Sequence, residues 1–288
     1  MKTLSAFLFL LTTAALLLAQ PIVSESKFVD VDHLKVHYTN YGKGETALVF
    51  IHGWACDETV WTDQAPTLAE KIRVITIDLP GHGQSDKPAT IEYNKDLYVR
   101  AIDGVINDAN VKSMILVSHS NGTPFARHYY RKFPAKVKAM VIVEGPLRAM
   151  FGEPARESFI AQLQGTNYPE SMGRMVDAMT KPVKDQTERE KIKAMMLKTP
   201  QHVAVSEFEA TDDAELWKED KIEVPTLIIL AKQPAWSPEY EKFVRGLIRK
   251  LDYQVWENVS HFLMMDKPRE FNAAVLKFLE QNQLLARQ

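Results

Sequence analysis

Short apolar runs alternate with amphipathic stretches along the chain from residue 27 onward. Short runs rich in apolar residues predict buried strands, and they occupy 47–53 (ALVFIHG), 72–81 (IRVITIDLPG), 113–117 (SMILV), 137–146 (VKAMVIVEGP), 224–231 (VPTLIILA) and 252–261 (DYQVWENVSH). The first residues of this region, 27–42, predict a β-hairpin. Apolar positions at helical spacing predict helices over 96–110, 123–133, 237–251 and 268–285.

This alternation predicts the fold class. Apolar strands that alternate with helices indicate an α/β fold, in which a mostly parallel sheet is covered by helices on both faces. Residues 147–222 break the pattern, since they contain helical patterns but no convincing strand. We therefore expect a core formed by 27–146 and 223–288, with 147–222 inserted as a helical cap.

The predicted cap is rich in methionine, with six of the 11 methionines of the chain. Methionine side chains adapt to varied apolar ligands, so the underside of a cap can form a substrate wall. Met172, Met175 and Met179 are the predicted substrate-binding residues. Plain core packing is the alternative role for methionines at helical spacing.

The first residues form a separate apolar segment. Lys2 precedes an apolar run at 4–19, and Gln20 and Pro21 follow it. A basic start and a run of this length are typical of a secretory signal peptide. We expect residues 1–19 to be removed and the protein to be secreted or periplasmic, with no stable membrane insertion; an uncleaved membrane anchor is the alternative.

Composition and charge narrow the class of partner. The chain has 288 residues, of which 45% are hydrophobic and 25% charged, as in ordinary globular proteins. Its formal net charge of −2 gives no electrostatic reason to expect nucleic acid as a partner. Cys56 is the only cysteine, so an internal disulfide is excluded and packing must stabilise the fold. The oligomeric state does not follow from the sequence.

The segment LVSHSNGTPFA (116–126) contains the strongest candidate for chemistry. A predicted strand turns into a predicted helix at Ser120, between the small residues Ser118 and Gly122. A sharp strand-to-helix turn of this kind is typical of a nucleophile elbow, whose usual pattern is G-x-S-x-G. Serine replaces the first glycine here, and an ordinary Ser/Gly turn is the alternative.

A nucleophilic serine needs a base and an oxyanion hole. His261 follows the last predicted strand, so it is expected at the same sheet edge as Ser120, where it can take the hydroxyl proton. A buried core histidine is the alternative. In HGWACD (52–57), Gly53 permits a tight turn that lets the backbone N–H of Trp54 face the site together with that of Asn121. His52 is expected to order this loop.

Four segments occur in an order and spacing that resemble the α/β-hydrolase superfamily: HGW (52–54), DLPGHGQSD (78–86), SHSNG (118–122) and SHFLMMDKP (260–268). The resemblance covers about residues 28–285 outside the cap and implies the α/β-hydrolase fold. It also implies roles for residues already singled out: Ser120 as nucleophile, His261 as base, Trp54 and Asn121 as oxyanion donors. His82 and Asp86 match a turn that is structural in the family.

The acid of the triad departs from the family pattern. In most members it is an aspartate three residues past a glycine, after the strand that corresponds to PTLIIL (225–230). Here Ala231 stands at the glycine position and Pro234 at the aspartate position. Glu144 follows the preceding strand, where some members, including several haloalkane dehalogenases, carry their acid. We predict Glu144 as the acid, with Glu239 and Asp57 as weaker candidates.

These residues predict a serine hydrolase that acts on carboxylic esters through an acyl-enzyme on Ser120. The expected partner is a small-molecule ester, with no metal or organic cofactor. Epoxide hydrolases and haloalkane dehalogenases of the superfamily use aspartate as nucleophile, so Ser120 argues against both. A lactonase, an amidase and a carbon–carbon bond hydrolase remain open. A non-catalytic ligand-binding protein is the alternative from another class.

Overall fold

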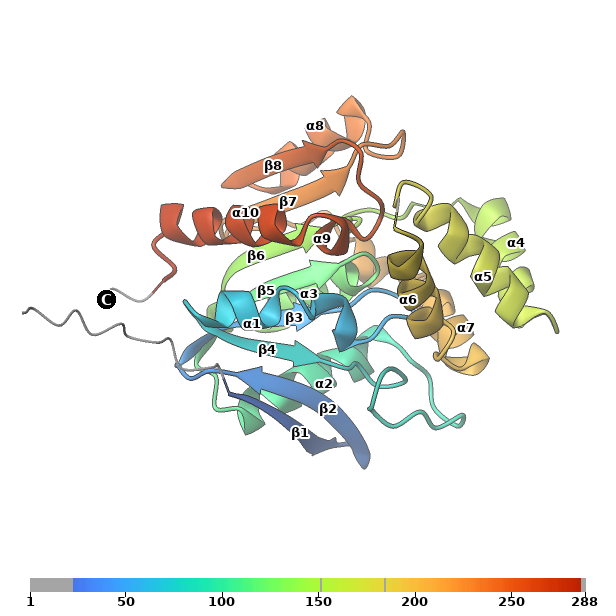
Figure 1. The fold of residues 1–288 in the computed structure, drawn as a ribbon, viewed down its shortest axis with the longest axis horizontal. Coiled ribbons are helices and arrows are strands. Elements are labelled where there is room, and N and C mark those ends of the chain that lie inside the picture. The colour runs from blue at the N-terminus through green and yellow to red at the C-terminus, as the bar shows by residue number, and fades with distance from the viewer. Residues whose placement is uncertain (1–22, 151, 184, 286–288) are drawn as a thin grey trace, which may run out of the picture.

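The structure is a computed structural model that describes residues 23–150, 152–183 and 185–285 (Figure 1). In these residues eight strands form one sheet: β1 Ser24–Val31, β2 Leu34–Tyr41, β3 Thr46–Ile51, β4 Arg73–Ile77, β5 Ser113–His119, β6 Val137–Val143, β7 Thr226–Ala231 and β8 Leu251–Trp256. The predicted signal peptide, residues 1–19, lies outside the described residues.

The helices fall into two groups, those of the core and those between β6 and β7. The core group comprises α1 Ala65–Ala69, α2 Lys95–Asp108, α3 Gly122–Lys132, α8 Pro238–Leu247, α9 Leu263–Asp266 and α10 Pro268–Gln281. The second group comprises α4 Glu153–Gln164, α5 Tyr168–Met179, α6 Gln186–Met196 and α7 Gln201–Ala210. Three short 3-10 helices are η1 Glu58–Trp61, η2 Pro134–Lys136 and η3 Ala214–Trp217. Across the described part of the chain, no helix is both long and apolar enough to cross a membrane.

The sheet is mostly parallel. Its strand order is β1-β2-β4-β3-β5-β6-β7-β8; β1 pairs with β2, and β2 with β4, in antiparallel fashion, while the remaining neighbours are parallel. The hairpin predicted at 27–42 is confirmed by β1 and β2. The predicted α/β fold with a mostly parallel sheet is confirmed.

Alternating side chains of the strands enter two separate cores. Leu48 and Phe50 of β3 pack in one cluster with residues of α1 and α10. Val49 and Ile51 of the same strand pack in the other cluster with residues of α2, α3 and α8. Because successive side chains of a strand point to opposite faces, a strand that is apolar throughout must be covered on both sides.

Three predicted boundaries near the C-terminus are wrong, and one is the end of the helix expected over 268–285, which ends at Gln281. The helix expected over 237–251 ends at Leu247, because Ile248 has the extended conformation with φ of −115° and ψ of 116°. The chain then enters β8, and the carbonyl of Lys250 accepts a hydrogen bond from the Thr226 N–H. The strand expected over 252–261 ends at Trp256, and Asn258 beyond it has a positive φ of 58°.

Helices α4–α7 lie beyond the carboxyl ends of the parallel strands, as the arrowheads in Figure 1 show. The two ends of this insertion meet at one buried side chain of α3. The Arg127 guanidinium donates to the carbonyl of Leu147 at 3.1 Å and to the carbonyl of Asp220 at 2.9 Å. Arg127 also pairs with the Asp220 carboxylate at 3.0 Å. Leu147, the first residue of the insertion, and Asp220, near its end, are therefore both anchored to the core.

Candidate active site

Ser120 lies at the sharp turn from β5 into α3. Its backbone has a φ of 49°, in the left-handed region that residues other than glycine seldom adopt. Gly122 permits the turn, because a Cβ there would lie 2.3 Å from the carbonyl oxygen of His52. Ser118 is buried, and its hydroxyl lies 3.0 Å from that of Thr123. This geometry presents the Ser120 hydroxyl at the edge of the sheet.

His261 and Glu144 reach Ser120 from the ends of two other strands. Glu144 follows β6 directly, and His261 lies between β8 and α9. Ser120 Oγ is 2.8 Å from His261 Nε2, and His261 Nδ1 is 3.0 Å from Glu144 Oε2. Because a carboxylate only accepts, Nδ1–H donates to Glu144, which leaves Nε2 to accept from the hydroxyl. The structure thus brings these three side chains into one hydrogen-bonded chain.

The loop after β7 holds the Glu144 carboxylate. Glu144 is 1% exposed, and its Oε1 accepts from the Ala231 N–H and, at 3.0 Å, from the Trp236 indole N–H. The Gln233 amide donates to Oε2 at 3.0 Å. A buried carboxylate requires such partners. The loop that lacks the usual acid therefore supplies hydrogen-bond donors to Glu144. Sequence reasoning missed this role, although KQPAW (232–236) contains Gln and Trp side chains that can donate.

The two weaker acid candidates lie elsewhere. Asp57 caps η1, where its side chain accepts from the Thr59 N–H at 2.9 Å. Glu239 is exposed in the first turn of α8. Glu144 is the carboxylate whose oxygen lies within hydrogen-bond distance of His261.

The loops that carry Trp54 and Asn121 lie against each other. A Cβ at Gly53 would lie 3.0 Å from the Cβ of Ser120, so the glycine permits the close approach. Over the described ranges, neither the Trp54 N–H nor the Asn121 N–H donates to a backbone carbonyl. Two backbone donors of this kind next to a nucleophile can stabilise an oxyanion.

Two buried histidines order these loops. His119 Nε2–H donates to the carbonyl of His261 at 2.9 Å, and burial, followed by the nearby His261, holds the pKa of His119 well below its usual value. His52 Nδ1–H donates to the Gly53 carbonyl at 2.9 Å, while its Nε2 accepts from the Leu79 N–H at 3.0 Å. Burial lowers the pKa of His52 to about 4. His52 therefore orders the loop in its neutral form, as expected.

A carboxylate from the insertion, which sequence reasoning missed, reaches the nucleophile turn. Glu207 of α7 is 2% exposed, and its Oε1 accepts from the Asn121 side-chain amide at 2.8 Å. Its Oε2 accepts from the Tyr98 hydroxyl at 3.2 Å and lies 3.1 Å from His82 Nε2. Burial alone would raise the pKa of Glu207, but His82 and Asn121 lower it below its usual value. No local pattern marks a partner 86 residues away.

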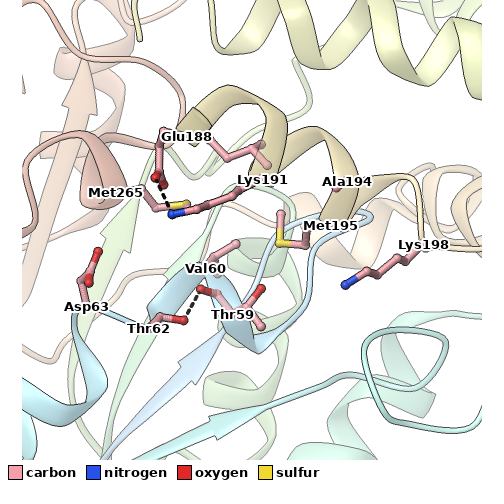
Figure 2. Close-up of a pocket in the computed structure, with 11 residues that line it drawn as sticks. Thr59, Val60, Thr62, Asp63, Glu188, Lys191, Ala194, Met195, Lys198 and Met265 are labelled. Carbon is pink, nitrogen blue, oxygen red and sulfur yellow. Dashed lines mark hydrogen bonds and ion pairs between the residues drawn. The ribbon is translucent and has the colours of Figure 1, made fainter. Parts of the chain in front are cut away.

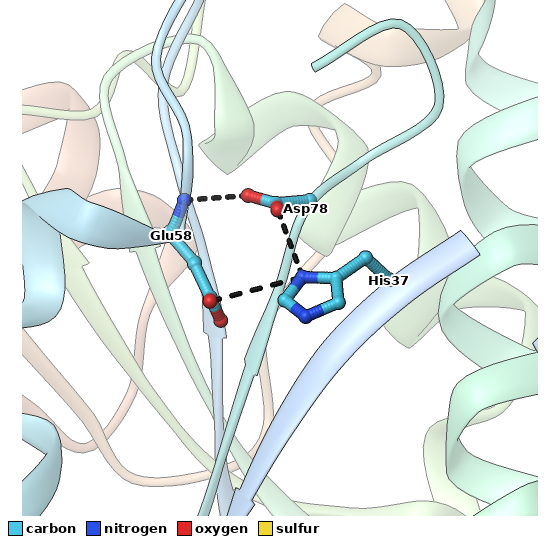
Figure 3. A group of neighbouring side chains, drawn as sticks. All are labelled: His37, Glu58 and Asp78. Atoms are coloured by element: carbon cyan, nitrogen blue, oxygen red, sulfur yellow. Dashed lines mark hydrogen bonds and ion pairs between the residues drawn. The ribbon is translucent and has the colours of Figure 1, made fainter. Parts of the chain in front are cut away.

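One cluster in the described part of the chain has the donor set of a metal site. His37, Glu58 and Asp78 offer ligand atoms that lie within 4.8 Å of one another (Figure 3). His37 Nδ1 is 2.9 Å from Asp78 Oδ2, and the Glu58 N–H donates to Asp78 Oδ1 at 2.8 Å. Burial alone would lower the pKa of His37, but Asp78 and Glu58 raise it. These contacts tie β2 and η1 to the loop 78–86.

The pocket in Figure 2 lies between the core and the insertion. Thr59 and Thr62 line it from the side of η1, and Lys191 and Met195 of α6 line it from the other side (Figure 2). None of the three hydrogen-bonded side chains at the nucleophile turn lines this pocket. Solvent reaches that site separately, since the His261 side chain is 20% exposed.

The three methionines predicted to bind substrate all lie on α5, but their exposure differs. Met172 is fully buried, so it offers no surface to a ligand, and its position supports a role in packing. Met175 and Met179 are half-buried. The carbonyl of Met179 accepts from the His261 N–H at 3.3 Å, which places this end of α5 next to His261.

Comparisons with known proteins agree with this fold. The sequence model of a family described as "alpha/beta hydrolase fold" matches residues 46–187. A solved thermophilic esterase is 27% identical with a TM-score of 0.74, and the alignment covers 92% of this chain and 100% of the esterase. Est816, described as an N-acyl homoserine lactone degrading enzyme, is 25% identical with a TM-score of 0.74, and the alignment covers 88% of this chain and 100% of Est816. The chain belongs to the α/β-hydrolase superfamily.

Curated relatives support a hydrolase. Epoxide hydrolase 3 of Xenopus tropicalis is 23% identical over 286 residues, which cover 88% of this chain and 77% of the frog protein. Other relatives match over shorter stretches: one in Escherichia coli (strain K12), a hydrolase, matches over 134 residues, and the chain spans 46% of its length. The bond that one of these relatives cleaves does not by itself identify the bond that this chain cleaves.

Proposed function

We propose that this protein is a serine hydrolase that cleaves carboxylic esters through an acyl-enzyme on Ser120. The observation that carries the proposal is the hydrogen-bonded chain from Ser120 Oγ through the His261 imidazole to Glu144 Oε2, with contacts of 2.8 and 3.0 Å. A nucleophile, a base and an acid that fixes the base are the parts that acyl transfer requires.

In the first step, Ser120 Oγ attacks the ester carbonyl carbon while His261 Nε2 takes the hydroxyl proton. The carbonyl oxygen becomes an oxyanion, to which the Trp54 and Asn121 N–H groups donate. Glu144 accepts from Nδ1–H and stabilises the imidazolium. When the tetrahedral intermediate collapses, the C–O bond to the alcohol breaks and Nε2–H protonates the leaving oxygen.

In the second step, His261 Nε2 takes a proton from water, whose oxygen attacks the acyl carbon. A second oxyanion forms in the same place, and its collapse breaks the bond to Ser120 Oγ, which regains the proton from Nε2. The carboxylic acid then leaves. Each proton is returned, so the cycle consumes one ester and one water and needs no further reactant.

Aromatic side chains next to the proposed oxyanion loop support an apolar substrate. The Trp54 ring lies 5.8 Å from that of Phe159 on α4 and 6.1 Å from that of Phe208 on α7, measured between centroids. We expect esters of short to medium acyl chains. The epoxide hydrolase activity named for the frog relative is not carried over, because Ser120 stands where that chemistry uses aspartate.

A lactonase is the second candidate, and the 25% identity to the N-acyl homoserine lactone degrading enzyme favours it. A lactone is a cyclic ester, so the same residues would open its ring by the same two steps. The difference is that the leaving alcohol stays attached to the acyl-enzyme until water releases the hydroxy acid.

The test combines a covalent probe with a substrate panel. A fluorophosphonate should label the wild-type protein and fail to label Ser120→Ala, because only an activated serine reacts rapidly. p-Nitrophenyl esters of graded chain length, and N-acyl homoserine lactones, should separate the two candidates by kcat/KM. An unlabelled wild-type protein that hydrolyses none of these compounds would refute the proposal in favour of ligand binding without catalysis. Undiminished hydrolysis by Ser120→Ala would refute the assignment of the nucleophile.

We also propose a secreted or periplasmic location for the mature protein. The support is the basic, then apolar, composition of residues 1–19. N-terminal sequencing of the protein from its source should begin shortly after residue 19. A mature chain that begins with Lys2 or Met1 in a membrane fraction would support the uncleaved anchor instead.

A further inference from the structure

One helix of the insertion contacts both residues whose N–H groups form the proposed oxyanion hole. The indole N–H of Trp54 donates to the carbonyl of Ala204 at 2.8 Å. The side-chain amide of Asn121 donates to Glu207 Oε1 at 2.8 Å. Ala204 and Glu207 are three residues apart on α7 and so lie on the same face of the helix.

The Asn121 side chain does not cap the helix that it precedes. Asn121 occupies the N-cap position of α3, where an asparagine usually accepts a hydrogen bond from the first turn of its own helix. Here the side chain makes no capping hydrogen bond and is directed to Glu207 instead. The orientation of the peptide that follows Ser120 therefore depends on a contact with the insertion.

The carboxylate of Glu207 is a firm anchor. It is 2% exposed and is also held by the Tyr98 hydroxyl at 3.2 Å, while His82 Nε2 lies 3.1 Å away. Both Tyr98 and His82 belong to the core, on α2 and the loop 78–86. Glu207 thus joins the insertion to the core next to the nucleophile turn, and a hydrogen bond from a neutral amide to a buried carboxylate is among the stronger kinds.

We propose that α7 positions the oxyanion hole, with Glu207 holding Asn121 and the Ala204 carbonyl holding Trp54. The inference rests on the proposed function, because it assigns the two backbone N–H groups to the oxyanion. Glu207 is a positioning residue that acts through Asn121 and does not touch the substrate. The hole is then complete only while α7 is docked on the core, and the core alone has the nucleophile and base without aligned donors.

The test compares Glu207→Ala, Asn121→Ala and the double variant on a p-nitrophenyl ester that the wild-type protein hydrolyses. Loss of an oxyanion donor lowers kcat by about 10²–10³-fold, and misalignment should have a smaller effect, about 10–10²-fold, with KM little changed. Because both residues act through one contact, the double variant should lose no more than either single variant.

Two further variants separate positioning from general stability. Glu207→Gln keeps an amide oxygen that can accept from Asn121, so its kcat should stay within about threefold of wild type. Glu209→Gln is the matched control on the same helix, since Glu209 is exposed and contacts Gln164 of the insertion. Trp54→Phe removes the indole donor to Ala204 while it keeps an aromatic ring, and it should also lower kcat. Wild-type kcat in both Glu207→Ala and Asn121→Ala, or additive losses in the double variant, would overturn the proposal.

Amide hydrogen exchange gives a readout that does not require catalysis. A peptide that spans residues 118–124 should exchange faster in Glu207→Ala than in the wild-type protein or in Glu209→Gln, because the peptide after Ser120 loses its anchor. Equal exchange in all three proteins would overturn the inference. Should the wild-type protein neither hydrolyse esters nor react with a fluorophosphonate, the proposed function fails, and the exchange rates alone decide whether α7 orders this turn.

Discussion

Replacing Glu144 by glutamine should impair the proposed reaction through the tautomer of His261. The three donors other than His261 dictate how a glutamine would sit. Its carbonyl oxygen must occupy the Oε1 position, because the Ala231 and Trp236 N–H groups both donate there. The amide NH₂ then takes the Oε2 position and faces His261 Nδ1, which is 3.0 Å from that atom in the structure. Nδ1 becomes an acceptor, the proton moves to Nε2, and the imidazole can no longer accept from Ser120.

The size of the effect follows from this reversal. An amide in place of the triad acid lowers kcat by about 10⁴-fold in a well-studied serine protease, through the same wrong tautomer. At about 1.4 kcal/mol for each factor of ten, that is about 5.5 kcal/mol of lost transition-state stabilisation. We expect a loss of about 10²–10⁴-fold in kcat, with KM and the melting temperature little changed.

The assay is steady-state hydrolysis of a p-nitrophenyl ester at pH 7, together with the rate of fluorophosphonate labelling. Glu239→Gln is the matched control, since it removes the charge of an exposed carboxylate at the start of α8. Asp57→Asn tests the other candidate, which caps η1. Near-wild-type turnover in Glu144→Gln with a collapse in either other variant would assign the acid elsewhere. If all three variants stay active, the site works as a Ser–His pair without a carboxylate.

Three further predictions concern stability and specificity. His52 has a pKa of about 4 in the folded chain, against about 6.5 for an ordinary histidine in the unfolded chain. As the pH falls from about 6.5 toward 4, the unfolded chain binds the proton more readily, so the free energy of unfolding should fall by about 1.4 kcal/mol per pH unit. Urea titrations at pH 7 and pH 5 measure this, and equal midpoints would contradict it. Gly122→Ala should destabilise the fold by about 1–3 kcal/mol or more, because its Cβ would meet the His52 carbonyl, whereas Gly246→Ala has open space among the described residues and should be neutral in thermal melts. Met179→Ala should change chain-length preference in the ester panel, while Met172→Ala should lower the melting temperature instead; the reverse pattern would exchange their roles.

The parts of the site that the sequence predicted are those with local causes. Ser120 could be recognised because a strand, a turn of small residues and a helix follow one another within a dozen positions. Glu144 was predicted as the acid because the side chain of Pro234, at the usual acid position after β7, cannot accept a hydrogen bond. His261 follows β8, and parallel strands bring their carboxyl ends to one edge of the sheet. The inferences for Ser120 and His261 need only the order of the elements and the chemistry of one residue, and that for Glu144 also needs the family pattern.

The parts that could not be predicted depend on contacts between distant segments. Glu207 reads as one charged residue in a helical stretch of the insertion, and its contact with Asn121 exists only after the insertion has docked. Gln233 and Trp236 were given no role from the sequence, although their N–H groups donate to the carboxylate that follows another strand. Met172 was predicted to bind substrate but is fully buried, because helical spacing alone does not distinguish a buried face of a helix from a ligand-facing one.

Arg127 also bears on how such an insertion can change during evolution. One buried guanidinium joins Leu147 and Asp220, near the two ends of the insertion, and so holds these ends together at α3. We therefore expect a changed segment between these two anchors to leave β6 and β7 in register, provided that it again packs apolar side chains against the core. Activity would not transfer as freely. Under the proposal above, an exchanged segment would restore it only if it again offered a carbonyl to the Trp54 indole and, three residues later, a carboxylate to the Asn121 amide.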